Sequence, residues 1–201
     1  RFDDRITGRV ADFSPGSIKV HVDIDPSSIN KVIRCHLPIV GDVGDVLAAV
    51  LALWKSRGSR TNGAALADWW RQIDGWKARK CLSYRRSDTV IKPQHALERL
   101  EALTCDHDRY ITTEVGQHQM WASQFVAYER PRQWLNSAGL GTMGFAVPAA
   151  MGAQVGEPDR VVWAIDGDGC FQMTNQELAT CAIEGAPIKV ALINNGNLGM
   201  V

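Results

Sequence analysis

The feature that most constrains the fold is a pair of apolar runs separated by one helix-length segment. Residues 160–166 (RVVWAID) and 188–194 (IKVALIN) are nearly continuous apolar runs, and 173–186 between them has a helical pattern. Apolar strands of this kind, alternating with helices, are typical of a parallel sheet covered on both faces. The sequence therefore predicts an α/β fold in which these two strands run parallel.

Polar residues follow each of these strands. The triplet Gly167-Asp168-Gly169 comes after the first, Asn194-Asn195 ends the second, and 24 residues separate Gly169 from Asn194. That spacing suits one helical return, and a right-handed crossover brings both strand ends to the same edge of the sheet. If the strands are neighbours, about 4.8 Å apart, Asp168 and Asn195 can share one small ion.

The residue types indicate which ion and which ligand. Carboxylate, amide and main-chain carbonyl oxygens suit Mg²⁺ or Ca²⁺, and Mg²⁺ usually completes its octahedron with phosphate oxygens and water. Gly167 and Gly169 allow a ligand to approach the backbone closely. A helix expected to begin near Met173 would direct its first amides to the same place. The pattern thus predicts a diphosphate bridged by magnesium.

The rest of the chain divides into segments. A strand over 17–24, an apolar run at 39–44 and a helix over 46–54 predict a Rossmann-like unit at 1–55. A charged, glycine-rich stretch and an amphipathic helix form a linker at 56–92. The second unit, 93–201, has helical patterns at 94–103 and 141–156 and a further strand at 109–115.

Composition excludes some partners. The 22 basic and 22 acidic residues give a formal net charge of zero, so no nucleic-acid or acidic-membrane partner is expected. No apolar run reaches the roughly 18 residues of a membrane span. Five cysteines without a CxxC spacing argue against a disulfide scaffold or a zinc ribbon. We expect buried free thiols and a reducing, cytoplasmic environment.

Beyond this local pattern, the chain resembles a known family. GDG followed after about 25 residues by NN is the diphosphate–metal motif of thiamine diphosphate enzymes. Within that superfamily the sequence is similar to the catalytic large subunits of acetolactate synthase, also called acetohydroxyacid synthase. The resemblance is carried by separate blocks: RFDDRITG (1–8), DIDP (23–26), GD (41–42), VGQHQMWASQF (115–125), LNSAGLGTMGFAVPAAMGAQ (135–154), AIDGDGCFQMTNQEL (164–178) and LINNGNLGMV (192–201).

The resemblance implies a role for each matching residue. Metal ligands would be Asp168, Asn195 and the main-chain carbonyl of Asn197. Contacts to the diphosphate would come from the glycine turn and from the VGQHQ block, and the aminopyrimidine would be supported by a methionine and its neighbours. The implied cofactor-binding residues, besides Asp168 and Asn195, are Val115, Gln117, His118, Gly141, Met143, Gly167, Gly169 and Cys170.

The first unit resembles the end of a middle domain that binds FAD. The matching positions are Arg5, Asp23, Asp42 and Val43, and Asp4 matches a residue near the substrate channel. The family's activating glutamate belongs to a pyrimidine domain that has no counterpart here. No catalytic residue is therefore expected in this chain, which we interpret as an inactive piece of a longer protein.

The resemblance also implies an activity. It would be a carboligase that condenses pyruvate with pyruvate or 2-ketobutyrate, giving 2-acetolactate or 2-aceto-2-hydroxybutyrate for branched-chain amino acid biosynthesis. A homodimer or higher oligomer is expected, with a small regulatory subunit as an optional partner. Two alternatives remain: another thiamine diphosphate enzyme, of the glyoxylate carboligase or pyruvate oxidase type, and a non-catalytic nucleotide-binding module.

Overall fold

The computed structural model describes residues 2–58 and 60–200, except for the side chain of Arg5. The chain divides into two compact units between Trp76 and Lys77, and each is described by itself. Both contain parallel strands, which confirms the predicted α/β class. Among the described residues, no helix is both long and apolar enough to cross a bilayer.

The first unit is built on two parallel strands, β1 (Val20–Asp23) and β2 (Leu37–Val40). Strand β1 is shorter than the predicted 17–24. Helix α2 (Val43–Ser56) follows β2, and Asp42 caps it by accepting hydrogen bonds from the amides of Gly44 (2.7 Å) and Asp45 (3.3 Å). An Asp at this position satisfies amides that the first helical turn leaves unpaired.

Short helices complete this part of the chain. Helix α1 (Asp4–Thr7) precedes two 3₁₀ turns at Val10–Asp12 and Pro26–Ser28. Helix α3 (Gly63–Ala78) contains Trp69, Trp70 and Trp76. Trp69 and Trp76 contact each other edge to face with their ring centroids 5.5 Å apart, yet both side chains remain exposed.

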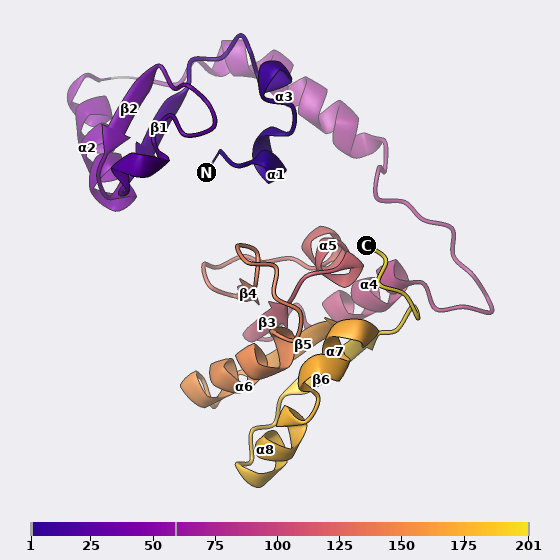
Figure 1. The fold of residues 1–201 in the computed structure, drawn as a ribbon. Helices are drawn as coiled ribbons and strands as arrows, with labels where there is room; N and C mark the ends of the chain where they lie inside the picture. The colour runs from indigo at the N-terminus through magenta and orange to yellow at the C-terminus, as the bar shows by residue number, and fades with distance from the viewer. Residues whose placement is uncertain (1, 59, 201) are drawn as a thin grey trace. The chain divides into compact units, whose positions relative to one another are not determined.

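The second unit contains a sheet of four parallel strands in the order β4-β3-β5-β6 (Figure 1). Strand β3 (Arg109–Thr113) and strand β5 (Val161–Gly167) form its centre. Strands β4 (Trp134–Asn136) and β6 (Lys189–Ile193) lie outside them. The neighbouring positions of β5 and β6 confirm the predicted parallel pair, with Gly167 beside Ile193 at its end.

Helices cover both faces of this sheet. On one face α4 (Pro93–Thr104) and α5 (Gln117–Phe125) pack through Leu97 and Ala122 on Ile111 and Ile165. On the other, α6 (Ala146–Gly156) packs through its alanines on β5. Because successive strand residues point to opposite faces, β5 contributes alternate residues to the two cores.

The crossover between β5 and β6 differs from the predicted single helix. It contains α7 (Asp168–Thr174) and α8 (Glu177–Ile183). At their junction the amides of Leu178 and Ala179 bond to carbonyls three residues back, which interrupts the α-helical ladder. The helix also begins at Asp168 rather than near Met173, so the GDG turn passes directly into the first helical turn.

Two other expectations needed correction. Helix α6 begins at Ala146 rather than at 141, because Gly141 (φ 70°) and Gly144 (φ 81°) adopt left-handed backbone conformations. Only Cys170 and Cys181 are buried, whereas Cys81 and Cys105 are exposed. All five cysteines are free, as predicted.

Candidate cofactor site

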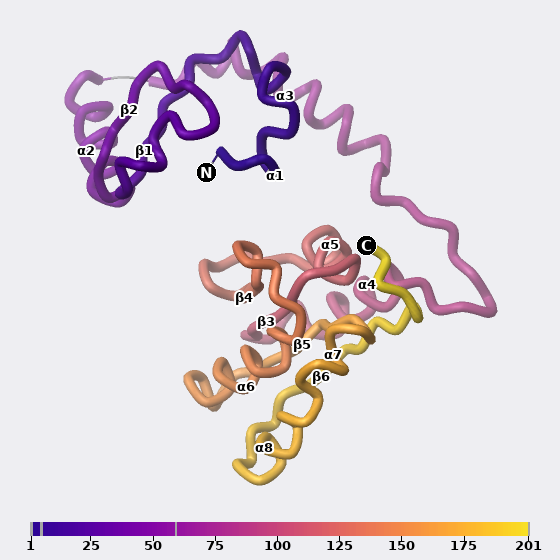
Figure 2. Tube along the Cα trace, in the orientation of Figure 1, coloured from indigo at the N-terminus to yellow at the C-terminus, as the bar shows by residue number. Residues whose placement is uncertain are grey.

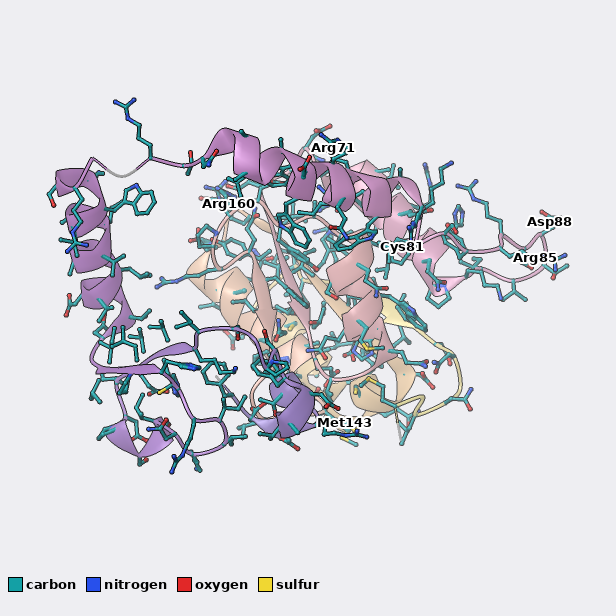
Figure 3. All side chains as sticks on the ribbon, turned by 90° about the horizontal axis from the view of Figure 1, so that it is seen from above. Arg71, Cys81, Arg85, Asp88, Met143 and Arg160 are labelled. Atoms are coloured by element: carbon teal, nitrogen blue, oxygen red, sulfur yellow. The ribbon has the colours of Figure 1, made fainter. Side chains whose placement is uncertain are left out.

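A cavity of about 250 Å³ lies at the carboxyl ends of β3, β5 and β6. Open α/β sheets bind ligands at this edge. Met143 lies at this end of the sheet, whereas Arg160, just before β5, lies at the other (Figure 3). Ten of the predicted residues line the cavity: Val115, Gln117, His118, Met143, Gly167, Asp168, Gly169, Cys170, Asn195 and Asn197.

The predicted metal ligands meet across the β5–β6 crossover. The Asp168 carboxylate accepts a hydrogen bond from the main-chain amide of Asn195 at 3.4 Å. The side-chain Oδ1 of Asn195 accepts from the Asn197 amide at 3.0 Å, and its Nδ2 donates to Gln117 at 3.0 Å. The geometric expectation that Asp168 and Asn195 converge is confirmed.

A loop closes one side of the cavity. The segment after β6 runs back past α7 toward α5 (Figure 2). There the side-chain amide of Gln117 donates a hydrogen bond to the Gly199 carbonyl at 3.2 Å. A Cβ atom at Gly169 would meet the Leu198 side chain at 2.5 Å, and one at Gly199 would overlap Gln117. Gly169 therefore lets the loop lie close to the GDG turn, and Gly199 lets it lie close to the start of α5.

Met143 also lies near that turn. Its methyl carbon would lie 3.9 Å from a Cβ atom on Gly169. Gly141 does not line the cavity in the described structure. A Cβ atom added at Gly141 would lie 3.7 Å from a methyl group of Val115. Val115 and Met143 thus line the cavity, whereas Gly141 lies behind Val115, and the contact of all three with a cofactor stays a prediction.

His118 is held between two glycines. The Nδ1–Cε1 edge of its ring is so close to Gly116 and Gly167 that a Cβ at either would lie 2.8 Å from Nδ1. The side chain is buried, and burial lowers the pKa of the imidazole, opposed by the nearby carboxylates of Glu114 and Asp168. Gly167 was expected to make room for a ligand; here it also makes room for a side chain.

Beneath the cavity lies a cluster that the sequence reading missed. One ring nitrogen of His118, one carboxylate oxygen each of Glu114 and Asp166, and Sγ of Cys170 all lie within 4.8 Å of one another. Burial, together with the adjacent Glu114, raises the pKa of Asp166 well above its usual range. The Cys170 thiol donates to the Val115 carbonyl at 3.3 Å, and burial raises its pKa to about 12.

Other lining residues were missed although they lie within the quoted blocks, because apolar side chains and glycine indicate no particular chemistry. They include residues after the asparagine pair and one tryptophan on α5, whose apolar character is also what a core position would show. Glu114 and Asp166 could have been noticed as acidic residues at the ends of two buried strands. The missed apolar and glycine lining residues are Gly116, Trp121, Ile193, Leu198, Gly199 and Met200.

The residues expected to bind FAD are in the first unit. Asp23 lines a cavity of about 290 Å³ with Phe2, His21 and Lys31, and its Oδ1 accepts from the Asp25 amide at 2.9 Å. Asp42 and Val43 do not line this cavity; Asp42 caps α2, and Val43 is exposed. The exposed Asp4 is in α1, and the Arg5 side chain lies outside the described residues.

Comparison with known proteins matches both parts of the chain. Residues 114–201 match the C-terminal TPP binding domain of the thiamine pyrophosphate enzymes, and residues 1–50 match their central domain. The chain belongs to the thiamine pyrophosphate enzymes. Thiamine pyrophosphate and thiamine diphosphate are the same molecule, so the family's cofactor is the kind of ligand that the strand-end motif predicted.

Relatives within these enzymes align with the whole chain. The chain is 55% identical to an acetolactate synthase of Mycobacterium leprae and 54% identical to the acetolactate synthase large subunit of Corynebacterium glutamicum. It is 44% identical to the isozyme 3 large subunit of Escherichia coli. The chain spans 32–35% of the length of these three relatives, about a third.

The residues present fit the cofactor. Asp168, Asn195 and Asn197 supply hard oxygen atoms at one edge of the cavity, the donor type that Mg²⁺ prefers. The glycines of the turn have no side chains of their own, and the apolar lining of Val115, Trp121 and Met143 suits an aromatic ring. The cavity thus combines a polar, metal-competent end with an apolar wall.

Proposed function

We propose that the full-length protein is a thiamine diphosphate-dependent acetolactate synthase. It would condense pyruvate with pyruvate or 2-ketobutyrate, giving 2-acetolactate or 2-aceto-2-hydroxybutyrate for branched-chain amino acid synthesis. The observation that carries this proposal is the 41–55% identity to acetolactate synthases across the entire chain. The arrangement of Asp168, Asn195 and Gln117 around one cavity supports it.

Each side of the cavity would have its own task. Asp168, Asn195 Oδ1 and the Asn197 carbonyl would hold Mg²⁺, and Asn195 would then exchange its bond to the Asn197 amide for the metal. His118, Gln117, Gly167, Gly169 and Cys170 would bind the diphosphate.

The apolar wall would orient the cofactor. Met143, supported by Val115 and Gly141, would pack against the aminopyrimidine and fix its angle to the thiazolium ring. Bound thiamine diphosphate supplies the electron sink for decarboxylation of a 2-keto acid. The apolar lining would exclude water from that reaction.

FAD binding by the first unit is part of the same proposal. Asp23, the last residue of β1, would accept from a ribose hydroxyl, and Arg5, Asp42 and Val43 are assigned by family resemblance. We also propose a homodimer or larger oligomer, a possible small regulatory subunit and a cytoplasmic location, all following from the acetolactate synthase assignment.

Product analysis tests the activity. Full-length protein with thiamine diphosphate, Mg²⁺ and FAD should form 2-acetolactate from pyruvate, and also 2-aceto-2-hydroxybutyrate when 2-ketobutyrate is added. The Asp168→Ala variant should lose both products, whereas Asp159→Ala, an exposed residue in the turn before β5, should keep them. Formation of tartronate semialdehyde from glyoxylate, with no acetolactate, would identify a different carboligase.

A further inference from the structure

Two buried carboxyl groups lie side by side beneath the candidate cofactor site. Asp166 is in β5, and Glu114 follows β3 one step beyond the last described pair of these strands, Thr113 with Ile165. Both side chains have a relative exposure of 0%. Acidic residues are almost never fully buried unless they are paired, so this pair requires an explanation that general packing does not provide.

The polar atoms of this pair are largely without partners. Glu114 Oε2 accepts a hydrogen bond from the Phe145 amide, just before α6, at 2.9 Å. Within the described part of the chain, Glu114 Oε1, both carboxyl oxygens of Asp166 and His118 Nε2 are buried without a hydrogen-bond partner. Buried polar atoms of this kind cost free energy when they stay unpaired.

These atoms can satisfy one another. A ring nitrogen of His118 and a carboxyl oxygen from each acid lie within 4.8 Å of one another. His118 also cannot move away easily, because its Nδ1–Cε1 edge lies against Gly116 and Gly167. One edge of the ring therefore lies against two glycines, and the carboxyl pair lies near its buried nitrogen.

We propose that Glu114 and Asp166 are positioning residues that hold the buried Nε2 of His118 and thereby orient its Nδ1 edge toward a bound phosphate. The hydrogen bond made by one imidazole nitrogen determines what the other nitrogen can do. Gly167, beside Nδ1, lines the cavity, so this edge is next to the place assigned to the diphosphate. The inference rests on the proposed function, since the phosphate is that of thiamine diphosphate.

A double-mutant cycle tests this coupling in the full-length protein. Thiamine diphosphate affinity is measured by calorimetry at saturating Mg²⁺ for wild type, Glu114→Leu, His118→Ala and the double variant. We expect Glu114→Leu to weaken binding about tenfold in the wild-type background, as second-layer partners of binding histidines do. In the His118→Ala background the same change should cost less than about twofold, because the residue acts through the ring.

Two further variants separate positioning from general stability. Glu114→Gln keeps the length and hydrogen-bonding capacity of the side chain and should restore affinity to within about threefold of wild type. Thr112 is in β3, the strand that Glu114 follows, and its hydroxyl donates a buried hydrogen bond to the Ala146 carbonyl at 2.8 Å. The Thr112→Val substitution removes this bond. It should lower the melting temperature without changing the affinity for thiamine diphosphate.

Several outcomes would overturn the proposal. Equal losses from Glu114→Leu in both backgrounds, or no loss in either, would show that the carboxyl pair does not act through His118. Tightly bound transition metal in the purified protein, removed by Asp166→Asn or Cys170→Ser, would make the cluster a metal site instead. If wild type bound no thiamine diphosphate at all, the proposed function itself would be rejected, which is a distinguishable result.

Discussion

The side-chain amide of Asn195 donates to the side-chain oxygen of Gln117 at 3.0 Å, linking the end of β6 to the start of α5. These residues are far apart in sequence, and each belongs to a different predicted part of the site. Their bond ties the candidate metal end of the cavity to the candidate diphosphate end. A change at Asn195 should therefore affect both.

Replacing Asn195 should weaken cofactor binding mainly through the loss of a metal ligand. We expect Asn195→Ala to lower the affinity for thiamine diphosphate by about tenfold at limiting Mg²⁺, because one oxygen ligand is lost. Excess Mg²⁺ should restore part of the affinity, as measured by calorimetry over a magnesium series. Asn194→Ala is the matched control, since Asn194 does not line the cavity; the metal role is wrong if magnesium gives no rescue.

A methyl group at Gly167 should strike His118. The backbone there (φ −91°, ψ 154°) is one that any residue adopts, so the cost of Gly167→Ala is steric. We expect a loss of about 1–3 kcal/mol in the free energy of unfolding, measured by urea denaturation.

Two controls accompany this prediction. The double variant Gly167→Ala/His118→Ala should recover most of the loss, because the overlapping ring is gone. Gly152→Ala, inside α6 with open space around it, should be neutral or stabilising by about 0.5–1 kcal/mol. A loss that persists in the double variant would mean that the collision with His118 is not its cause.

Asp166→Asn should stabilise the protein, and more so at higher pH. The pKa of Asp166 is raised in the folded protein, so between about pH 4 and the folded pKa the unfolded state binds fewer protons. Stability from this group therefore falls as the pH rises, whereas asparagine resembles the protonated acid and does not ionise. We expect a gain of about 1–3 kcal/mol at pH 8 and little at pH 4.

The measurement for Asp166→Asn is chemical denaturation from pH 4 to 8 without Mg²⁺ or thiamine diphosphate. Asp159→Asn, an exposed substitution in the same segment, controls for the change in net charge. A gain that does not vary with pH, or a loss at pH 8, would contradict the raised pKa.

The cysteines should differ in reactivity. The thiols of Cys81 and Cys105 are exposed, whereas Cys170 is buried with its pKa raised to about 12. Because the thiolate is the reactive form, a thiol reagent at pH 8 should label Cys81 and Cys105 within minutes and leave Cys170 and Cys181 unlabelled until denaturant is added. Peptide mapping identifies the labelled sites, and rapid labelling of Cys170 in native protein would contradict its burial.

The parts of the fold that the sequence predicted share a physical basis. Strands β5 and β6 are near-continuous apolar runs, and the length between them allows one right-handed return, so their parallel course and shared edge could be predicted. Strand β4 could not, because three residues carry too little pattern. The true start of α6 at Ala146 depends on left-handed backbone at Gly141 and Gly144, which composition does not reveal.

The same contrast holds for the site. The convergence of Asp168 and Asn195 was predictable because both follow buried parallel strands that end at the same edge of the sheet. The carboxyl pair could not be predicted. Glu114 and Asp166 are recognised as a pair only when β3 and β5 lie side by side and both side chains are found to be buried. Leu198 and Gly199 line the cavity because the loop after β6 folds back onto α5, where the Gln117 side chain donates a hydrogen bond to the Gly199 carbonyl.

The ring of His118 between Gly116 and Gly167 has a consequence for how such sequences diverge. A glycine in a phosphate-binding turn is usually explained by its backbone, but the torsions at Gly167 suit any residue. The size of the side chain at position 118 limits which residue types fit at position 167. Substitutions at the two positions should therefore be epistatic, with alanine at 167 tolerated only where 118 has already lost its ring.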